Sequence, residues 1–309
     1  NLMQPVKECF DTVKKDYLKF LNKEKIFSQS KGSKIKSLKK IYIPISFWIE
    51  KKYKKKGKTL FIGISGGQGS GKTTITKILK IILKNFFKRE TLIFSIDDFY
   101  KTLKDRQKMS STIHPLFKTR GVPGTHDINL IKNFLNLIKK RNFKKLKLPR
   151  FDKSTDNRLK RKYWHDIKKK PEIIILEGWC VGAKPQSSSI LNKPINSLEK
   201  NEDKNLVWRK YVNNKLKSEY KNFFSLIDYF IFMKIPNFKM VFKWRFLQEI
   251  KLKKKSYQKK TIMSYKEIKR FIMFYQRITL QMIKDLSKSA SIIMLLKKNH
   301  EIKKVLFKL

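Results

Sequence analysis

Apolar runs and helical patterns alternate along most of this 309-residue chain. Five short runs are almost continuously apolar, as strands buried on both faces are; they span residues 59–64, 91–96, 172–176, 229–235 and 291–296. After the first run, apolar residues recur at the spacing of one helix face, at Ile75, Ile78, Leu79, Ile82, Leu83 and Phe86. Strands that alternate with helices predict an α/β fold with a mainly parallel sheet.

The segment between the last two runs predicts a long amphipathic helix. Ser264 and Glu267 have the spacing of a capping box at its start. One face of this helix would carry Ile268, Phe271, Ile272 and Tyr275. Residues 187–205, rich in Ser, Asn and Lys, and the lysine-rich residues 252–260 are typical of loops.

The first 50 residues have a helical or mixed pattern. The lysine run at 51–58 predicts a solvated linker ahead of the first strand of the core. We therefore expect two parts, an N-terminal helical or mixed extension over 1–56 and an α/β domain over 57–309.

The chain is strongly basic, with 75 Lys and Arg against 24 Asp and Glu and a formal net charge of +51. Such a charge attracts polyanions, including nucleic acids and nucleotides. Lys, Ile, Asn and Phe are all abundant, which is the pattern of an AT-rich genome. Because lysine far outnumbers arginine, the residue that usually reads phosphates and bases in bidentate fashion, we favour compositional drift over specific nucleic-acid binding.

The two cysteines, Cys9 and Cys180, lie far apart and show no CxxC spacing. They predict neither a disulfide framework nor a zinc site. No uncharged apolar stretch approaches the roughly 18 residues of a membrane span, and the first residues lack the pattern of a signal peptide. We expect a cytoplasmic protein; since the sequence begins with Asn1, whether a leader precedes it stays open.

The clearest motif is "GGQGSGKT" at residues 66–73, between the first apolar run and the first amphipathic helix. It matches G-x-x-x-x-G-K-[ST], whose small residues let backbone N–H groups wrap a phosphate at a helix N-terminus. Lys72 would reach the β- and γ-phosphates, and the Thr73 hydroxyl would bind Mg²⁺. The motif predicts a site for ATP and Mg²⁺ made of Gly66, Gly67, Gln68, Gly69, Ser70, Gly71, Lys72, Thr73 and Thr74.

Carboxylates follow two further strands. "SIDDFY" at 95–100 places Asp97 and Asp98 at the C-terminal end of the second strand, which we expect beside the P-loop strand, where ligands bind in parallel sheets. One of them could accept a proton from an attacking hydroxyl, the alternative being a pair of helix caps. "ILEGWC" at 175–180 places Glu177 after the third strand, where it could hold Mg²⁺ directly or through water.

Together these motifs resemble the D-glycerate 3-kinases, within the phosphoribulokinase/uridine kinase group of P-loop kinases. The resemblance covers about residues 41–296 and includes "YIPISFWI", "RGVPGTHD", "LPRFDKSTDNR", "EGWCVGA", "WRKYVN", "VFKWRFLQE" and "FYQRIT", in the family's order. "PGTHD" and "PRFDKS" are its most distinctive pieces. It implies a three-layer P-loop fold and the ATP-dependent phosphorylation of D-glycerate to 3-phosphoglycerate.

The resemblance also implies roles at the matching positions. Asp97 would be the catalytic base, while Lys72 would neutralise charge on the transferred group. The acceptor pocket would contain Asp98, Tyr100, Arg120, His126, Asp127, Arg150, Asp152 and Lys153, with its cations facing the glycerate carboxylate. Arg245 lies where these kinases carry lid arginines that close over the phosphoryl group.

Two other functions stay open. A P-loop kinase could act on another small acceptor, such as a nucleoside, pantothenate or a sugar phosphate, although the cationic "RGVPGTHD" and "PRFDKS" blocks suit a small acid better. A nucleic-acid-binding P-loop protein should interleave basic and aromatic residues along one stripe, whereas here the lysines are scattered. We read His114, His165 and His300 as structural, and Trp179 and Trp208 as core residues. The sequence does not predict an oligomeric state.

Overall fold

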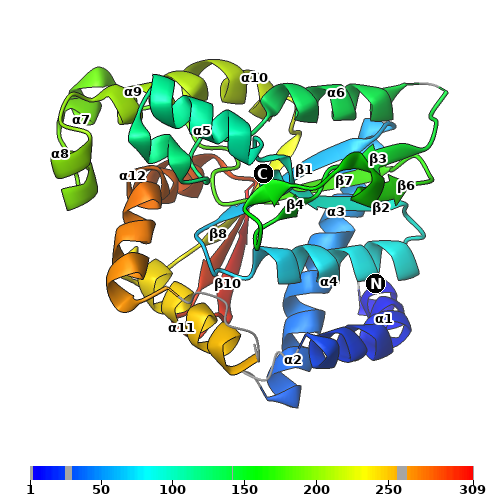
Figure 1. Ribbon diagram of the computed structural model, residues 1–309. Coiled ribbons are helices and arrows are strands. Elements are labelled where there is room, and N and C mark those ends of the chain that lie inside the picture. Colours follow the sequence, from blue (N-terminus) through cyan, green and yellow to red (C-terminus); the bar gives the residue numbers. More distant parts are fainter. Residues whose placement is uncertain (1–2, 25–29, 141, 256–262, 309) are drawn as a thin grey trace.

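The computed structural model describes residues 3–24, 30–140, 142–255 and 263–308. At its centre lies a six-stranded sheet in the order β10-β9-β8-β1-β7-β2 (Figure 1). Its strands are β1 (Leu60–Gly66), β2 (Thr91–Ser95), β7 (Ile173–Gly178), β8 (Tyr229–Lys234), β9 (Ile292–Leu296) and β10 (Ile302–Phe307). Neighbouring strands are parallel except β9 and β10. The five predicted strands and the mainly parallel sheet are confirmed.

Helices cover both faces of the sheet, so the core has three layers. Along β1, Leu60, Ile62 and Ile64 pack with α3 (Ile43–Lys56) and α4 (Lys72–Asn85), whereas Phe61 packs with the cluster on the opposite face. That opposite cluster includes residues of α6 (Ile128–Lys139) and α9 (Val207–Lys215). Burial on both faces explains why these strands read as continuous apolar runs.

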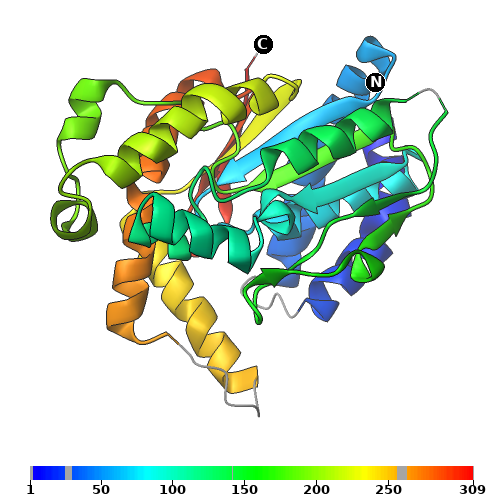
Figure 2. The same ribbon diagram turned by 45° about the horizontal axis from the view of Figure 1, so that its top comes forward.

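Helix α12 (Tyr265–Ser289) begins as the capping box predicts. Ser264 Oγ accepts the backbone N–H of Glu267 at 3.3 Å, and a Glu267 carboxylate oxygen accepts the Ser264 N–H at 2.7 Å. Figures 1 and 2 show α12 beside α11 (Lys239–Lys255), the pair projecting from the sheet. Ile268, Ile272 and Tyr275 are buried, as expected for the predicted apolar face.

Three of the segments expected to be loops or linkers differ from that expectation. The lysine run is helical as far as Lys56, because lysine is a good helix former on an exposed face, and Gly57 then ends α3 with a φ of 66°. The stretch 187–205 contains α7 (Ser188–Asn192) and α8 (Ser197–Glu202), the latter capped by Asn196. Of the predicted loop 252–260, the first four residues belong to α11, and residues 256–260 lie outside the described ranges.

The remaining elements are short or lie in the connections. The helices are α1 (Met3–Lys23), α2 (Lys31–Ser37), α5 (Leu103–Thr112) and α10 (Lys221–Phe224). Single helical turns cover Leu38–Tyr42, Ile96–Phe99, Pro115–Lys118, Arg161–Tyr163 and Leu216–Tyr220. Two small antiparallel pairs join β3 (Leu146–Leu148) to β6 (His165–Ile167) and β4 (Phe151–Asp152) to β5 (Asn157–Arg158).

The predicted N-terminal extension packs onto the rest of the chain. Helix α1 contacts α4, and Ile45 and Ile49 of α3 share a core cluster with β1. The division after residue 56 stays a prediction. Within the described ranges, no helix has the length and apolarity needed to cross a bilayer. Cys9 and Cys180 are both buried free thiols.

Candidate active site

The glycine-rich segment forms a tight turn from β1 into α4. Gly69 and Gly71 have φ angles of 75° and 92°, in the left-handed region that favours glycine. A Cβ at Gly69 would lie 2.8 Å from the Cβ of Trp244 on α11. The turn therefore needs glycine at position 69 for two reasons, its backbone conformation and its close packing.

Lys72 and Thr73 open α4 directly behind this turn. The Lys72 ammonium donates to the carbonyl oxygens of Gly66 and Gly67 at 2.9 and 3.0 Å. The Thr73 hydroxyl donates to a carboxylate oxygen of Glu177 at 3.0 Å. Burial lowers the pKa of Lys72, while the charges of Glu177 and Asp97 act against that shift. Burial also raises the pKa of Glu177, although Lys72 opposes the change.

The position of β7 explains how Glu177 reaches Thr73. We expected β2 beside the P-loop strand, but β7 lies between β1 and β2. In the register of the sheet, Glu177 is opposite Ile64 of β1 and Ser95 of β2. Glu177 therefore stands at the centre of the carboxyl edge, between the P-loop and the segment that carries Asp97.

The P-loop segment fits a nucleotide phosphate with Mg²⁺. Ser65 Oγ and Ser70 Oγ, which can each donate to a phosphate oxygen, are buried and have no hydrogen-bond partner among the described residues. The Thr73 hydroxyl and the Glu177 carboxylate are hard oxygen donors, the type that Mg²⁺ prefers. No cluster of three or more His, Cys, Asp or Glu side chains suited to a metal occurs in the described part of the chain, so Mg²⁺ would need phosphate and water ligands as well.

The two adjacent aspartates have different surroundings. They lie in a helical turn over Ile96–Phe99 rather than at the end of the strand itself, which ends at Ser95. Asp98 caps this turn by accepting the Ser95 N–H at 3.2 Å. Asp97 instead accepts the Tyr100 hydroxyl at 2.9 Å and the Lys153 ammonium at 2.8 Å.

Electrostatics separate the two carboxyl groups further. Burial raises the pKa of Asp98 to about 6, despite the opposing Ser95 bond. Burial acts in the same direction on Asp97, but Lys153, His126 and Tyr100 together hold the pKa of Asp97 below its ordinary value. Asp97 is thus ionised over a wider pH range than its neighbour, so at neutral pH its carboxylate is free of a proton, although a lowered pKa also makes it the weaker base of the two.

Lys153 reaches Asp97 from the turn between β4 and β5. Asp152 shapes that turn by accepting the Ser154 N–H at 2.8 Å and the Ser154 hydroxyl at 2.6 Å. Asp156, at the other end of the turn, forms ion pairs with Arg120 and with the fully buried Arg106, the latter at 3.0 Å. Two guanidinium groups therefore fix the turn that carries Lys153.

Three predicted pocket residues have other positions or partners. Asp127 caps α6 by accepting the Leu130 N–H at 3.0 Å and forms an ion pair with Arg158 at 3.1 Å. Arg150 is exposed, and its charge lowers the pKa of His165, after the larger effect of burial. His126 is fully buried behind Tyr100, with Nδ1 2.6 Å from the Tyr220 hydroxyl.

The predicted lid arginine lies on α11, beside the P-loop. Arg245 forms an ion pair with Glu249, and its guanidinium carbon is 5.3 Å from the centre of the Phe271 ring. Thr74 is the third residue of α4 and is half-buried. Lys72, Thr73, Glu177, Asp97, Tyr100 and Lys153 are brought together, and Arg120 and Arg245 lie at the edges of this group.

No sequence pattern predicted the hollow beside the P-loop. It has a volume of about 460 Å³ and is lined by Trp244, Gln248 and Asn299, among others. His300 stacks on Trp244 with 4.2 Å between ring centres, and its Nε2 donates to the Gly69 carbonyl at 2.9 Å. A lone histidine and a core tryptophan carry no motif, so only tertiary packing places them here.

Tyr275 is a second residue whose place the sequence pattern did not predict. Its hydroxyl donates to the Arg120 carbonyl at 3.2 Å. A Cβ at Gly121 would lie 2.2 Å from that hydroxyl oxygen, so Tyr275 packs directly on the "RGVPG" segment. The residue was expected only to lie on the apolar face of its helix.

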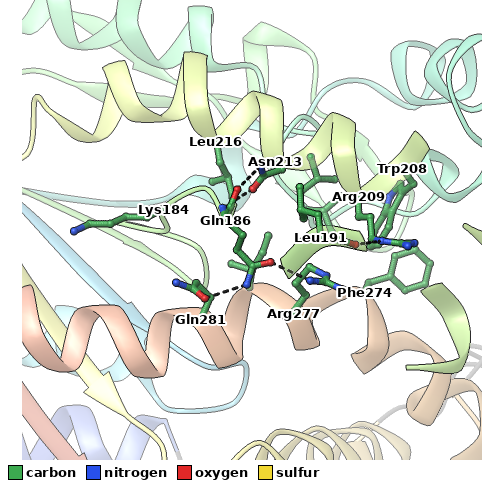
Figure 3. A pocket seen from close by; sticks show the side chains of 13 residues that line it. Lys184, Gln186, Leu191, Trp208, Arg209, Asn213, Leu216, Phe274, Arg277 and Gln281 are labelled. Carbon is green, nitrogen blue, oxygen red and sulfur yellow. Dashed lines mark hydrogen bonds between the residues drawn. The ribbon is translucent and has the colours of Figure 1, made fainter. Parts of the chain in front are cut away.

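A separate small pocket lies between α9 and α12, where hydrogen bonds and ion pairs join neighbouring helices. Figure 3 shows Gln186 between Asn213 and Gln281, with Arg277 and Arg209 nearby. Arg277 donates to the buried Glu199 of α8 at 2.8 and 2.6 Å. The cavity measures about 20 Å³, room for a single water. Since Arg209 and Arg277 are paired with Asp203 and Glu199 and the space is small, this pocket joins helices rather than holding a substrate.

Comparison with known proteins agrees with this geometry. The Phosphoribulokinase / Uridine kinase family matches residues 61–185. The chain is 33% identical to the uncharacterized kinase mug58 of Schizosaccharomyces pombe over 248 residues, which is 77% of this chain and 86% of that protein. It is 28% identical to the chloroplastic D-glycerate 3-kinase of Arabidopsis thaliana over 251 residues, 76% of this chain and 52% of that protein.

The fold also has a counterpart among solved structures. D-glycerate 3-kinase from Cryptococcus neoformans superimposes with a TM-score of 0.73 at 21% identity, covering 87% of this chain and 99% of that one. At that identity the likeness shows a shared fold, including the sheet that carries the P-loop. The chain is an ATP-dependent small-molecule kinase and belongs to the D-glycerate 3-kinase family, within the phosphoribulokinase/uridine kinase group of P-loop kinases.

Proposed function

We propose that this kinase transfers the γ-phosphoryl group of ATP to a hydroxyl of D-glycerate and so forms 3-phosphoglycerate. One observation carries the proposal. Lys153, a cation on the turn between β4 and β5, lies 2.8 Å from Asp97, the carboxylate that we propose as the proton acceptor. A small hydroxy acid offers a hydroxyl to the aspartate and a carboxylate to the lysine.

The nucleotide would occupy the P-loop and the hollow beside it. Backbone N–H groups of residues 67–73 would bind the phosphates, and Lys72 would leave the Gly66 and Gly67 carbonyls to neutralise charge on the transferred group. Thr73 and, directly or through water, Glu177 would hold Mg²⁺, which supplies positive charge at the β- and γ-phosphates. The base would lie in the hollow lined by Trp244 and Asn299.

The acceptor would lie between Asp97 and the turn that carries Lys153. Asp97 takes the hydroxyl proton as the oxygen attacks phosphorus. Lys153 and Arg120 face the acceptor carboxylate, and Arg245 covers the phosphoryl group from α11. Asp98, Asp127 and Asp152 support the surrounding turns by capping them, and Arg150 lies outside this group. Most of the catalysis is then positioning and charge stabilisation.

The aromatic residues near Asp97 favour a small acid over a nucleoside. A nucleoside base would need an open ring face on which to stack. Tyr100 is 3% exposed and lies against His126 with 4.5 Å between ring centres, so its face is already covered. Phe151 meets the Tyr100 ring edge-on at 5.1 Å. The side of the site that remains open carries the charged Lys153.

An acceptor screen tests the proposal. Purified protein and its Lys72→Ala variant are assayed for ATP consumption with D-glycerate, L-glycerate, nucleosides, pantothenate and ribulose 5-phosphate. We expect D-glycerate to give the highest kcat/KM, with the variant inactive on every acceptor. NMR of the product identifies the phosphorylated hydroxyl. A higher kcat/KM with any other acceptor would overturn the assignment of the substrate.

A further inference from the structure

A column of three ring side chains stands behind Asp97. The Tyr100 hydroxyl donates to Asp97 Oδ1 at 2.9 Å. The Tyr100 ring lies nearly parallel to the His126 imidazole, at 19° and 4.5 Å between centres. His126 Nδ1 is 2.6 Å from the hydroxyl of Tyr220, and that hydroxyl accepts the Gly124 N–H at 3.0 Å. The column therefore runs from the carboxylate to the turn Leu216–Tyr220.

The backbone fixes the two segments that carry Tyr100 and His126. These two residues form an isolated antiparallel bridge. On either side, the Lys101 N–H donates to the Thr125 carbonyl and the Asp127 N–H donates to the Phe99 carbonyl, each at 2.8 Å. Because the ring contact is combined with main-chain bonds on both sides, Tyr100 cannot turn away from Asp97 without breaking this pairing.

The hydrogen bonds indicate a neutral His126. The Tyr220 oxygen accepts the Gly124 N–H, which leaves its own proton to donate; we assign that proton to Nδ1, so that the ring proton lies on Nε2. Nε2 is buried and lacks a hydrogen-bond partner among the described residues. Burial accordingly lowers the pKa of His126 to about 4, against the opposing charge of Asp97.

We propose that Tyr100, His126 and Tyr220 are positioning residues for the candidate base. Tyr100 orients the Asp97 carboxylate by donating a hydrogen bond to it. The neutral His126, which is hydrogen-bonded to Tyr220, fixes the orientation of the Tyr100 ring. His126 then acts through Tyr100 and not as a ligand of the acceptor or a carrier of protons. This inference rests on the proposed function for its kinetic consequences, but its structural part can be measured without any substrate.

Hydroxyl deletions isolate the two ends of the column. Tyr100→Phe keeps the ring contact and removes the bond to Asp97, whereas Tyr220→Phe leaves the Tyr100–Asp97 bond in place and unpairs both His126 Nδ1 and the Gly124 N–H. Hydrogen bonds to charged groups contribute more than those between neutral groups. We expect kcat to fall about tenfold in Tyr100→Phe and roughly threefold in Tyr220→Phe, with KM for ATP unchanged in both.

Carboxyl NMR of the ligand-free protein gives the first readout. In protein labelled with ¹³C at the aspartate carboxyl carbons, the Asp97 signal is assigned with Asp97→Asn. Its midpoint should move upward by about one pH unit in Tyr100→Phe, because the ionised form loses a donor. The other groups around Asp97 stay in place, namely Lys72, Lys153, Glu177, Asp98, Cys180 and Tyr275. An unchanged midpoint would overturn the role of Tyr100.

The histidine itself gives a second readout. The chain has four histidines, so ¹⁵N labelling with a His126→Gln variant identifies the ring signals. We expect a neutral ring with the proton on Nε2 from pH 5 upward, and a changed Nδ1 shift in Tyr220→Phe. A ring that titrates near pH 6.5, or that carries its proton on Nδ1, contradicts the column.

Tyr17→Phe is the matched control, since it also removes a buried tyrosine hydroxyl, here one that donates to the Lys34 carbonyl at 3.0 Å. It should leave the Asp97 midpoint and kcat unchanged. If the wild-type protein phosphorylates none of the tested acceptors, the proposed function fails, yet the two NMR readouts still decide whether the column exists.

Discussion

The proposed nucleotide half and the proposed acceptor half of the site are built in different ways. The phosphate-binding part of the nucleotide half comes from one continuous segment, residues 66–74, and its main binding groups would belong to the backbone. The acceptor half combines Asp97, Arg120, Lys153 and Tyr275, which come from four separate segments and are joined by side-chain contacts. The first half depends on local backbone conformation, and the second depends on tertiary structure around it.

The largest effect should come from the nucleotide half. Lys72→Ala removes the cation that would neutralise the transferred phosphoryl group, and we expect kcat to fall about a thousandfold. Steady-state rates and calorimetric titration with ATP measure the loss. Lys77→Ala is the control on the same helix, because Lys77 forms an ion pair with Glu24 at 2.8 Å instead. Similar rates for the two variants would contradict the role of Lys72 in the nucleotide half.

The base of the acceptor half should separate chemistry from nucleotide binding. Asp97→Asn preserves the side chain's shape but removes the proton acceptor, so kcat should fall about a hundredfold. ATP affinity, which belongs to the other half, should stay within about twofold of wild type by calorimetry. If Asp97→Asn were nearly as active as wild type while Asp98→Asn were inactive, the base would be Asp98 and the present assignment would be wrong.

Lys153 tests whether binding of the acceptor can be separated from binding of ATP. Lys153→Met keeps the aliphatic stem but removes the charge that would face the acceptor carboxylate, so KM for D-glycerate should rise by about tenfold or more. KM for ATP should hardly change. Lys162→Met, a nearby exposed lysine, is the control. Equal changes in both KM values would show that the halves are not separable.

Asp98→Asn should have the smallest effect on activity and a visible one on stability. With a folded pKa of about 6, above the ordinary value, the folded state binds the proton more tightly than the unfolded state. The associated stability is present at low pH and is lost as pH rises through about 6. The amide keeps the cap without a buried charge, so the variant should be about 1–3 kcal/mol more stable than wild type at pH 7.

Urea unfolding at pH 4 and pH 7 measures the difference between the two proteins, and kcat should stay within about threefold of wild type. A variant less stable than wild type at pH 7 would mean that the ionised carboxylate strengthens the cap more than burial weakens it.

The same contrast explains what could be predicted from the sequence. Strands buried on both faces, the P-loop and the capping box of α12 are local patterns, and each was found. The strand order was not, since nothing in the sequence places β7 between β1 and β2. The family resemblance selected Asp97 over Asp98 as the base, but no local pattern predicted their different hydrogen bonds, which arise from a helical turn that begins one residue beyond the strand.

The acceptor half depends on contacts that local patterns do not describe. Asp127 and Asp152 match pocket motifs, yet both carboxylates bind backbone N–H groups next to them. Conversely, His300 and Tyr275 belong to no local chemical pattern but contact Gly69 and Gly121 across the fold. A motif fixes which residues are near each other in sequence, whereas a binding pocket needs side chains from distant segments to point the same way.

The packing of two tryptophans has a practical consequence for following this enzyme in solution. Trp244 lies on Gly69 of the P-loop, and the Trp179 indole N–H donates to the Gly121 carbonyl at 2.9 Å. Indole emission responds to its immediate surroundings, so each half of the site contains its own intrinsic fluorophore. With the other tryptophans replaced by phenylalanine, ATP should alter the emission of Trp244 and the acceptor that of Trp179. The order in which the two substrates bind could then be measured by stopped-flow fluorescence without an added dye.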